Sequence, residues 1–409
     1  MPRIFTALDI GSSTVRVLVA QINADERPQI LGTGVAQTQG MRRGVVADIE
    51  DVAKSIEAAV RAAQAISGIT VTSVFVGVNG VHLQAQESRG VIAVARADKE
   101  ITEADVTRAV HAAEMVNLPP NREIIEVIAR TFNIDDERGI KNPVGMNGIR
   151  LEVNGLLIVG STPFLRNLTK AIEKAKLDIR DLIPGPMAAA EPVLTKRQKE
   201  LGVMALDIGA ETTGLAVFEE GEITQVQILP IGSAHITNDL AIGLRTDLDT
   251  AEKIKIRYGT CLPDAVRKNE TIDLSELGMG EAIHVRRQEV AEIIGCRMKE
   301  ILELANQELE KINRKGFLPA GAVLVGGGAK MPGLVELGRQ VLMLPVKVGY
   351  PSELQGLVDQ VADPGFAKVV GLITYPSVSG KESAQGGGEN IGFGKMKRKV
   401  AKLFKSMLP

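Results

Sequence analysis

The triplet Asp-Ile-Gly occurs twice in this chain, at residues 9–11 and 207–209, and the same local pattern surrounds both copies. Each triplet ends an apolar run and is followed by a turn rich in Gly, Ser and Thr. Two more apolar runs, separated by a polar turn, come next. Apolar runs of this length, bounded by turn residues, predict β-strands. The repeated unit of three strands therefore predicts two related domains in one chain.

Both turns have the composition of phosphate-binding hairpins. Glycine has no Cβ, so the main chain can approach a ligand closely and present N–H groups and hydroxyls to phosphate oxygens. Asp9 and Asp207 each end an apolar strand beside such a turn, where a carboxylate can hold Mg²⁺ through water. One such triplet would be an ordinary strand end. Two of them in the same context favour a nucleotide clamp between two lobes.

A third glycine-rich segment, residues 326–328, ends an apolar strand and turns toward a helix. Such a turn lets the backbone reach a ligand and points a helix N-terminus at it. The alternative is a plain strand-to-helix turn. The segment 251–255 predicts a helix in which Glu252 and Lys255 lie one turn apart on one face. They could contact a ribose or base, or form an ordinary solvated face.

The composition is typical of a soluble, cytosolic protein with more than one core. A chain of 409 residues is too long for a single core, and 44% of its residues are hydrophobic. The formal net charge of −2 gives no signature of nucleic-acid binding. The two cysteines form no CxxC pair, and the four histidines show no metal-ligand spacing. No apolar run reaches the ~18 residues that span a bilayer, and the N-terminus does not resemble a signal peptide.

The first lobe is expected at 1–83 and 158–200, with an insertion of distinct pattern at 84–157. Apolar periodicity, turn residues and a capping pattern locate its elements. They are a helix at 51–66, a strand at 71–78, a short strand at 90–94, a capped helix from Thr102, a strand at 123–134, a core strand from Leu156 and a helix at 163–176.

The second lobe is expected at 201–228 and 301–376, with a subdomain at 229–300 between its two parts. Its predicted elements are three strands from Val203, a helical region at 238–258, a long amphipathic helix at 287–312, a strand at 322–328, a helix with Pro332 in its first turn and a core helix at 365–375. The last helix follows the whole second lobe, so we expect it to pack near the junction of the lobes.

The tail contains a Gly- and Ser-rich tether at 377–394 and a short basic segment at 395–409. A helix over the basic segment would carry an apolar stripe on one face, formed by Met396, Val400, Leu403, Phe404 and Met407. Basic residues occupy most of the remaining positions, and they include Lys397, Arg398, Lys399 and Lys402; none of the remaining positions is acidic. A basic amphipathic helix of this kind suits an anionic membrane surface. The alternatives are a docked helix or a disordered basic tail, and the apolar stripe argues against nucleic acid.

Taken together, the two hairpins, the glycine turn and the 251–255 helix resemble the actin/Hsp70/hexokinase nucleotide-binding core over residues 4–376. The insertion, through 101–136 and 139–153, is similar to the extra first-lobe subdomain (1C) of the FtsA family of bacterial cell-division proteins. The resemblance implies an α/β, actin-like two-lobed fold with an inserted α+β subdomain and a C-terminal amphipathic helix.

The resemblance also implies a function. Members of this family bind ATP and Mg²⁺ and are at most slow ATPases. They polymerise on the inner face of the cytoplasmic membrane at the division site. There they tether the ring of the tubulin-like protein FtsZ and recruit other divisome proteins.

By motif, the resemblance assigns roles to individual positions. Those implied for the nucleotide are Gly11, Ser12 and Ser13 in the first phosphate loop, Gly209, Ala210, Glu211 and Thr212 in the second, Gly326, Gly327 and Gly328 toward the adenosine, and Glu252 and Lys255 on the adenosine-side helix. The long helix with Arg297 resembles the surface that binds the FtsZ C-terminal peptide, although Arg297 could instead pair with Glu300 or Glu303 of its own helix.

Two departures from the family pattern concern the phosphate loops. Thr14 stands where related loops often have a lysine, and Arg16 could replace that lysine only if its side chain lies on the right face of its strand. The second loop reads GAETT rather than GGGTT, and Gly214 stands where an Asp often follows. Fewer groups would then stabilise the transferring phosphoryl charge, so fast hydrolysis is not expected.

Two other functions remain open at this point. The pilus-assembly protein PilM has the same core and a similar insertion, but the tethered basic helix argues against it. A sugar or acid kinase on this core would need a catalytic base in an acceptor cleft, and the sequence offers no convincing one.

Overall fold

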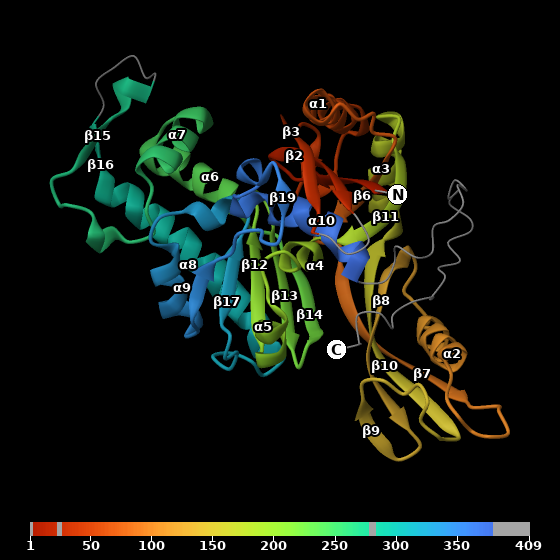
Figure 1. Ribbon diagram of the computed structural model, residues 1–409. Helices are drawn as coiled ribbons and strands as arrows, with labels where there is room; N and C mark the ends of the chain where they lie inside the picture. Colours follow the sequence, from red (N-terminus) through yellow and green to blue (C-terminus); the bar gives the residue numbers. More distant parts are fainter. Residues whose placement is uncertain (1–2, 23–26, 278–283, 379–409) are drawn as a thin grey trace.

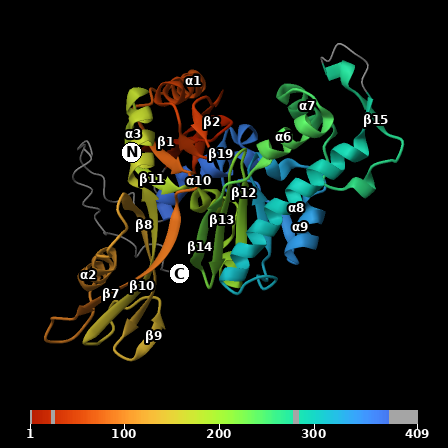
Figure 2. The ribbon, with the colours of Figure 1, turned by 180° about the vertical axis from the view of Figure 1, so that it is seen from behind.

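The computed structural model describes residues 3–22, 27–277 and 284–378. It shows two lobes, each built on a mixed β-sheet, and a smaller subdomain that projects from the first lobe (Figure 1). The view from behind shows the same three parts, with helix α10 (Ala367–Val378) between the two main sheets (Figure 2). The predicted two-lobed α/β fold with an inserted subdomain is confirmed.

Five strands of each main sheet are arranged in the same order, so that β3-β2-β1-β6-β11 corresponds to β14-β13-β12-β17-β18, and the first sheet has β19 as a sixth strand beside β3. The first is β11-β6-β1-β2-β3-β19 and the second is β14-β13-β12-β17-β18. The first contains β1 (Arg3–Ile10), β2 (Thr14–Ile22), β3 (Gln29–Gln37), β6 (Ser73–Val78), β11 (Asp178–Pro184) and β19 (Gln355–Gly356). The second contains β12 (Val203–Ile208), β13 (Thr213–Glu219), β14 (Glu222–Leu229), β17 (Ala322–Val325) and β18 (Val346–Val348).

Pairing within the sheets confirms the duplication that the sequence predicts. In each lobe three antiparallel strands come first, and two parallel strands extend the sheet beyond the first of them. Residues 5–10 of β1 and all of β12 are buried, because these central strands are covered on both faces. The carboxyl ends of β1 and β12 carry the two Asp-Ile-Gly triplets.

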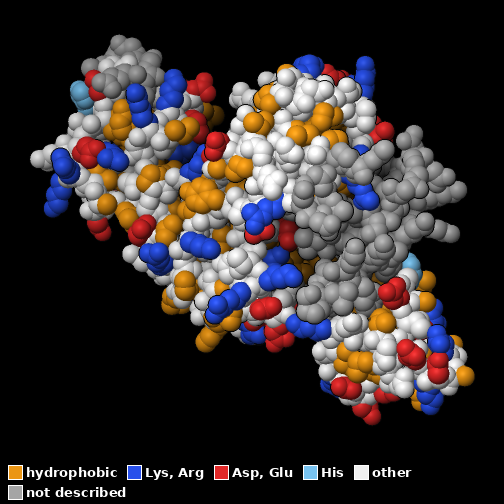
Figure 3. Space-filling model, in the orientation of Figure 1, with side chains coloured by type: hydrophobic (Ala, Val, Ile, Leu, Met, Phe, Trp, Pro, Cys, Tyr) orange, Lys and Arg blue, Asp and Glu red, His pale blue; other side chains and the backbone are white. Residues whose placement is uncertain are grey.

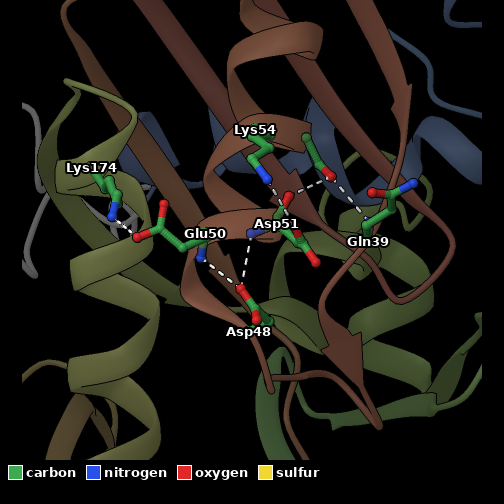
Figure 4. A network of polar contacts seen from close by, with 7 residues as sticks. Gln39, Asp48, Glu50, Asp51, Lys54 and Lys174 are labelled. Atoms are coloured by element: carbon green, nitrogen blue, oxygen red, sulfur yellow. Dashed lines mark hydrogen bonds and ion pairs between the residues drawn. The ribbon is translucent and has the colours of Figure 1, made fainter.

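Helix α1 (Ile49–Ser67) packs on β3 and β2 and begins at a well-capped end. The Asp48 carboxylate accepts hydrogen bonds from the backbone N–H groups of Glu50 and Asp51, at 2.8 and 3.1 Å (Figure 4). Asp48 thus satisfies two N–H groups that a helix start otherwise leaves unpaired. Lys174, at the end of α3 (Thr162–Lys174), pairs with Glu50 and joins the two helices.

The inserted subdomain has a four-stranded sheet of order β7-β10-β8-β9, covered by one helix. Its elements are β7 (Gln84–Ala93), α2 (Glu103–Glu114), β8 (Arg122–Ile134), β9 (Glu137–Ile140) and β10 (Arg150–Ser161). Thr102 caps α2 in a capping box with Asp105, as predicted. The expected start of a core strand at Leu156 is wrong, because β10 runs without a break from Arg150.

Strand β10 belongs to two hydrophobic cores. Leu151 and Val153 pack in the core of the insertion, whereas Leu156 and Ile158 pack in the core of the first lobe. The subdomain is therefore a continuation of the first-lobe structure rather than a module on a linker.

Among its described residues, the subdomain of the second lobe contains three α-helices and a two-stranded ribbon. They are α6 (Ser233–Leu244), α7 (Leu248–Tyr258), α8 (Arg287–Lys311), β15 (Thr271–Asp273) and β16 (His284–Arg286). The single helical region expected at 238–258 is two helices, because Arg245 has a left-handed backbone (φ 53°) that ends α6. Asp247 then caps α7 by accepting a 2.9 Å hydrogen bond from the Thr250 N–H.

Two further expectations need correction. Strand β17 ends at Val325, and a 3-10 turn follows at Gly327–Lys330. Helix α9 (Leu334–Leu342) begins after Gly333, so Pro332 precedes the N-cap instead of lying in the first turn. The Pro332 carbonyl accepts a 2.8 Å hydrogen bond from the Cys261 N–H and joins α9 to the loop after α7.

At the junction of the lobes α10 crosses α4 (Gly185–Ala190), as expected of the last core helix. The crossing is tight, since a Cβ on Gly371 would lie 1.7 Å from the Ala188 carbonyl oxygen. Helix α5 (Lys196–Leu201) then leads into the second lobe.

No helix in the described ranges combines the length and apolar character needed to cross a bilayer. The predicted basic helix at 395–409, and the predicted tether except for its first two residues, lie outside the described residues.

Candidate functional site

The two hairpin turns that follow β1 and β12 have the same geometry. The Gly11 N–H donates to the Thr14 carbonyl at 3.1 Å, and the Gly209 N–H donates to the Thr212 carbonyl at 2.9 Å. A Cβ on either glycine would lie within 2.9 Å of the accepting oxygen. Only glycine fits either turn without distortion. The turns leave Ser12, Ser13, Ala210 and Glu211 at their tips.

The second turn also lies against the N-terminus of α6. The N–H groups of Ser233 and Ala234 donate to the carbonyls of Gly209 and Ala210, at 2.8 and 2.7 Å. The positive end of the α6 dipole therefore lies directly behind the second turn, where it favours an anion.

A short hairpin of β4 (Met41–Arg42) and β5 (Val45–Val46) joins the two turns. The Gly44 N–H donates to Ser12 Oγ at 3.2 Å, and the Arg43 N–H donates to the Glu211 carboxylate of the other lobe. Glu211, which departs from the usual glycine of this loop, thus has a structural partner. Nothing in the sequence indicated this link, because its donors are backbone N–H groups that any residue could supply.

The aspartates of the two triplets lie close together with a lysine between them. Lys368 Nζ lies 2.8 Å from Asp207 Oδ2 and 3.8 Å from Asp9 Oδ1. Asp9 also accepts a 2.8 Å hydrogen bond from the amide of the buried Asn79. Burial lowers the pKa of Lys368, but Asp207 and Asp9 more than offset burial and hold the pKa above its ordinary value. The lysine is therefore a stable cation.

The Lys368 ammonium lies between the two carboxylates, so Asp9 and Asp207 cannot also bridge a metal ion directly at that point. The expected Mg²⁺, held through water, stays a prediction. Within the described ranges, no group of three or more His, Cys, Asp or Glu side chains could hold a metal.

The glycine turn after β17 lies against the second triplet. Gly326 has φ 85°, and a Cβ there would lie 2.5 Å from both Asp207 Oδ1 and the Ile208 carbonyl oxygen. A Cβ on Gly328 would also meet Ile208, whereas Gly327 faces open space. These glycines thus let the backbone approach Asp207, as a nucleotide cradle needs.

Arg16 lies directly opposite Asp9 in the β1–β2 pair, so its side chain is on the same face of the sheet. Its guanidinium lies 5.4 Å from the centre of the Phe366 ring. Its buried Nε has no hydrogen-bond partner in the described part of the chain. An unpaired buried donor on the face of the sheet that carries Asp9 is a group that an anionic ligand could satisfy.

Glu252 and Lys255 of α7 form a connected group behind the second turn. Lys255 Nζ donates to Glu252 Oε2 at 2.6 Å, to Thr237 Oγ1 at 2.9 Å and to the Ser233 carbonyl at 3.3 Å. Lys255 is buried and Glu252 is half exposed. Both side chains lie next to the α6 N-terminus. Their expected contact with a ribose or base stays a prediction.

Arg297 lines a groove between α6 and α8. Its guanidinium forms a bidentate ion pair with the Asp239 carboxylate, with Nε–Oδ2 and Nη2–Oδ1 distances of 2.6 and 2.9 Å, and also pairs with Glu300. The groove has a volume of about 470 Å³ and exposes Ile242 and Ile293 at its apolar floor. The intrahelical pair with Glu300 that the sequence left open is present, together with a partner on α6 that the sequence did not indicate.

Two functional candidates were missed by the sequence analysis. Lys368 lies in an apolar run, FAKVVGLIT, and one charge inside a predicted core helix was the available signal. Asn79 ends β6 within an Asn-Gly pair, which the sequence indicated only as a turn.

Comparison with known proteins gives matches along most of the chain. A family model described as "Cell division protein FtsA" matches residues 204–371, and one described as "SHS2 domain inserted in FTSA" matches residues 80–159. The FtsA of Pseudomonas aeruginosa is 36% identical over 373 residues, which cover 91% of this chain and 89% of that protein. The FtsA of Bacillus subtilis is 36% identical over 390 residues, covering 95% and 86%. The FtsA of Escherichia coli is 33% identical over 388 residues, covering 93% and 91%.

Solved structures of low sequence identity show the same fold. A chain of the PilM-PilN type IV pilus biogenesis complex has a TM-score of 0.67 at 17% identity, covering 91% of this chain and 98% of that chain. MreB5 of Spiroplasma citri bound to AMPPNP has a TM-score of 0.52 at 13% identity, covering 93% and 98%. These likenesses establish an actin-like fold and carry no further functional conclusion.

Proposed function

The chain belongs to the FtsA family of cell division proteins, and we propose that it binds an adenine nucleotide between its two lobes. The observation that carries this proposal is the pair of glycine turns of the same geometry, which follow equivalent strands of two equivalent sheets and are joined by the β4–β5 hairpin. The α6 N-terminus, the Gly326 turn and the unpaired Arg16 Nε add groups that favour an anion there. The neighbour bound to AMPPNP has the same fold.

Titration of the full-length protein with a fluorescent ATP analogue, with ADP and GTP as competitors, tests this proposal. ATP and ADP should compete, and Gly209→Val should weaken binding by about tenfold or more because it distorts the second turn. Thermal unfolding of the variant checks that it is folded. Equal affinity of the folded variant and the wild type would contradict the assignment of the turn.

Hydrolysis is proposed to be slow at most. The first turn has Thr14 in place of a lysine, and the second turn carries Glu211, whose negative charge would oppose a phosphoryl group gaining charge. Rapid turnover with small-molecule acceptors would instead favour a kinase.

We further propose that the α6–α8 groove binds the C-terminal peptide of FtsZ. Ile242, which is 78% exposed, and Ile293 can take an apolar side chain of the peptide. Arg297 is held by Asp239 and can share its guanidinium with a peptide carboxylate at the rim. Glu292 and Glu300 also line the groove, so a peptide with a basic residue next to its apolar anchor fits better than a purely acidic one.

Arg297→Glu tests the groove in a fluorescence anisotropy titration with a labelled FtsZ peptide. The change places a fourth carboxylate among Asp239, Glu292 and Glu300 and should weaken binding by about tenfold or more. Lys299→Glu makes the same charge change two residues along α8, outside this groove, and should bind like the wild type. Wild-type binding by Arg297→Glu would exclude this groove.

At the level of the cell, we propose a filament-forming scaffold on the cytoplasmic face of the membrane that tethers the FtsZ ring and recruits divisome proteins. The support is family membership together with the basic amphipathic sequence at 395–409. On the face drawn in Figure 3, basic and acidic side chains are interspersed over both lobes, a pattern that suits protein partners better than nucleic acid. A PilM-like role is favoured only by fold, at 17% identity.

A further inference from the structure

Lys368 is a buried cation in a position that ordinarily disfavours one. It is the second residue of α10, and its side chain is only 15% exposed. The N-terminal end of a helix carries a partial positive charge, so a lysine in the first turn is unfavourable there. Burial adds a second cost. The carboxylates of Asp207 and Asp9, at 2.8 and 3.8 Å from Nζ, offset these two costs and stabilise the charged lysine.

The lysine also connects three parts of the molecule. Asp9 comes from the first lobe, Asp207 from the second, and Lys368 from the helix that crosses between them. Pro364, just before α10, accepts a 2.9 Å hydrogen bond from the Gly326 N–H, so the same segment also holds the glycine turn. Lys368 therefore lies where the structural supports of both phosphate turns meet.

A divalent ion would compete with this ammonium rather than join it. The two carboxylates carry two negative charges, and Lys368 already neutralises one of them. A second cation within a few ångströms would be repelled strongly in a partly dry site. Mg²⁺ also loses its water reluctantly, whereas the ammonium is part of the fold.

We propose that Lys368 takes the place of a carboxylate-held Mg²⁺ as the cation that joins the two lobes and faces the phosphates of the nucleotide. An ammonium has three N–H donors, and Asp207 accepts at hydrogen-bond distance while Asp9 lies beyond it. The ammonium can thus donate to a phosphate oxygen as well. This inference rests on the proposed nucleotide binding. The Lys368 ammonium supplies the positive charge that is missing from the first turn, where Thr14 stands in place of a lysine.

The experiment is a titration of the full-length protein with a fluorescent ATP analogue, in EDTA and in excess Mg²⁺. Wild-type affinity should change by less than about threefold between the two conditions. Lys368→Met should lose about tenfold or more in EDTA, and Mg²⁺ should restore binding, because the two carboxylates are then free to hold it. Lys368→Arg keeps the cation and should retain binding in EDTA. Lys330→Met removes an exposed lysine from the neighbouring Asp363 and should behave like the wild type.

The outcomes separate this inference from the function on which it rests. Wild-type binding that rises about tenfold with Mg²⁺, or Lys368→Met that binds like the wild type in EDTA, would overturn the role of Lys368 alone. No binding by the wild type in either condition would overturn nucleotide binding itself. If Lys368→Met does not fold, the double variant Lys368→Met/Asp207→Asn removes the uncompensated charge. It should bind weakly in EDTA and gain little from Mg²⁺, and wild-type affinity in EDTA would overturn the role of Lys368.

Discussion

At the scale of single residues, the cleft depends on glycines whose neighbours leave no room for a Cβ. Gly326→Ala should destabilise the protein by roughly 1–3 kcal/mol, since the new Cβ would clash with Asp207 and Ile208 and φ is 85°. Gly327→Ala is the matched control, because nothing lies within 4 Å of its Cβ, and its effect should stay within about 0.5 kcal/mol. Urea unfolding measures both, and equal midpoints would contradict the prediction.

His82 provides a residue-scale prediction for pH. Burial, and then the nearby Arg122, lower its pKa from 6.5 to about 4. Its Nδ1 accepts a 3.1 Å hydrogen bond from the Ser161 N–H, which needs the neutral ring. The unfolded chain therefore binds more protons than the folded one between these pH values. Stability should fall as the pH drops from about 6.5 to about 4, by up to about 3 kcal/mol.

Urea unfolding across this pH window, for the wild type and His82→Gln, tests the origin of the slope. The variant has no imidazole at this position, so its stability should depend less on pH. Equal pH slopes for the two proteins would assign the effect to other groups.

Residue-level chemistry was predictable where a backbone rule applied and was missed where the partner lay far away in the chain. The glycines at 11, 209 and 326 could be found because their turns follow apolar strands. Lys368 is 359 positions from Asp9 along the chain and 161 positions from Asp207. A local sequence pattern cannot reveal pairs of residues so far apart. The sequence therefore did not indicate that an ammonium lies between the two aspartates that were expected to hold Mg²⁺ through water.

At the scale of elements, two basic side chains connect the inserted subdomain to the second lobe: Lys141, which donates to the Glu220 carbonyl, and Arg130 of β8. Arg130 donates to the carbonyls of Ile223 and Thr224 on β14, at 2.8 and 2.7 Å. Arg130→Ala should release this contact and cost about 1–3 kcal/mol locally, because charged donors to buried carbonyls are lost. Hydrogen–deuterium exchange should then rise along β14.

Arg150→Ala is the control for this contact. Arg150 pairs with Glu152 inside the same subdomain, at 2.7 Å, so its loss should leave exchange along β14 unchanged. Unchanged exchange in Arg130→Ala would show that other contacts hold the subdomain against the second lobe.

The predicted boundaries of elements were wrong where a single backbone angle ended a helix, or where one strand contributed to two hydrophobic cores. The left-handed Arg245 divides the expected helical region at 238–258 into α6 and α7, and no glycine lies at this position to indicate the break. Strand β10 was divided in the prediction because its two halves serve different cores, although its backbone is continuous. The long α8, with a sustained apolar stripe, was predicted to within one residue at its end.

At the scale of the whole molecule, the duplicated lobes followed directly from the duplicated triplet, whereas the membrane anchor remains a sequence prediction. The apolar stripe at 395–409 has five main side chains, each contributing at most ~1.5–3 kcal/mol on full burial. Interfacial burial is partial, and ordering the helix opposes it. Each basic residue adds about 1 kcal/mol near an anionic leaflet. A monomer should therefore bind weakly and reversibly.

A filament would change this balance, because many copies share one surface. Each bound helix raises the effective concentration of the next, so the assembled protein should stay on the membrane while monomers detach. High salt should weaken the attachment, since it screens the basic residues.

Phe404→Asp tests the anchor by placing a charge in the apolar stripe, at its largest side chain. It should release the protein from anionic liposomes in co-sedimentation while nucleotide affinity stays unchanged, because the cleft is built from other residues. Ser406→Asp adds the same charge outside the apolar stripe of the predicted helix, so it should weaken binding only by reducing the attraction to the anionic surface. If Phe404→Asp pellets at low salt as fully as the wild type, this segment is not the anchor. If both variants are released equally, net charge rather than the stripe governs binding.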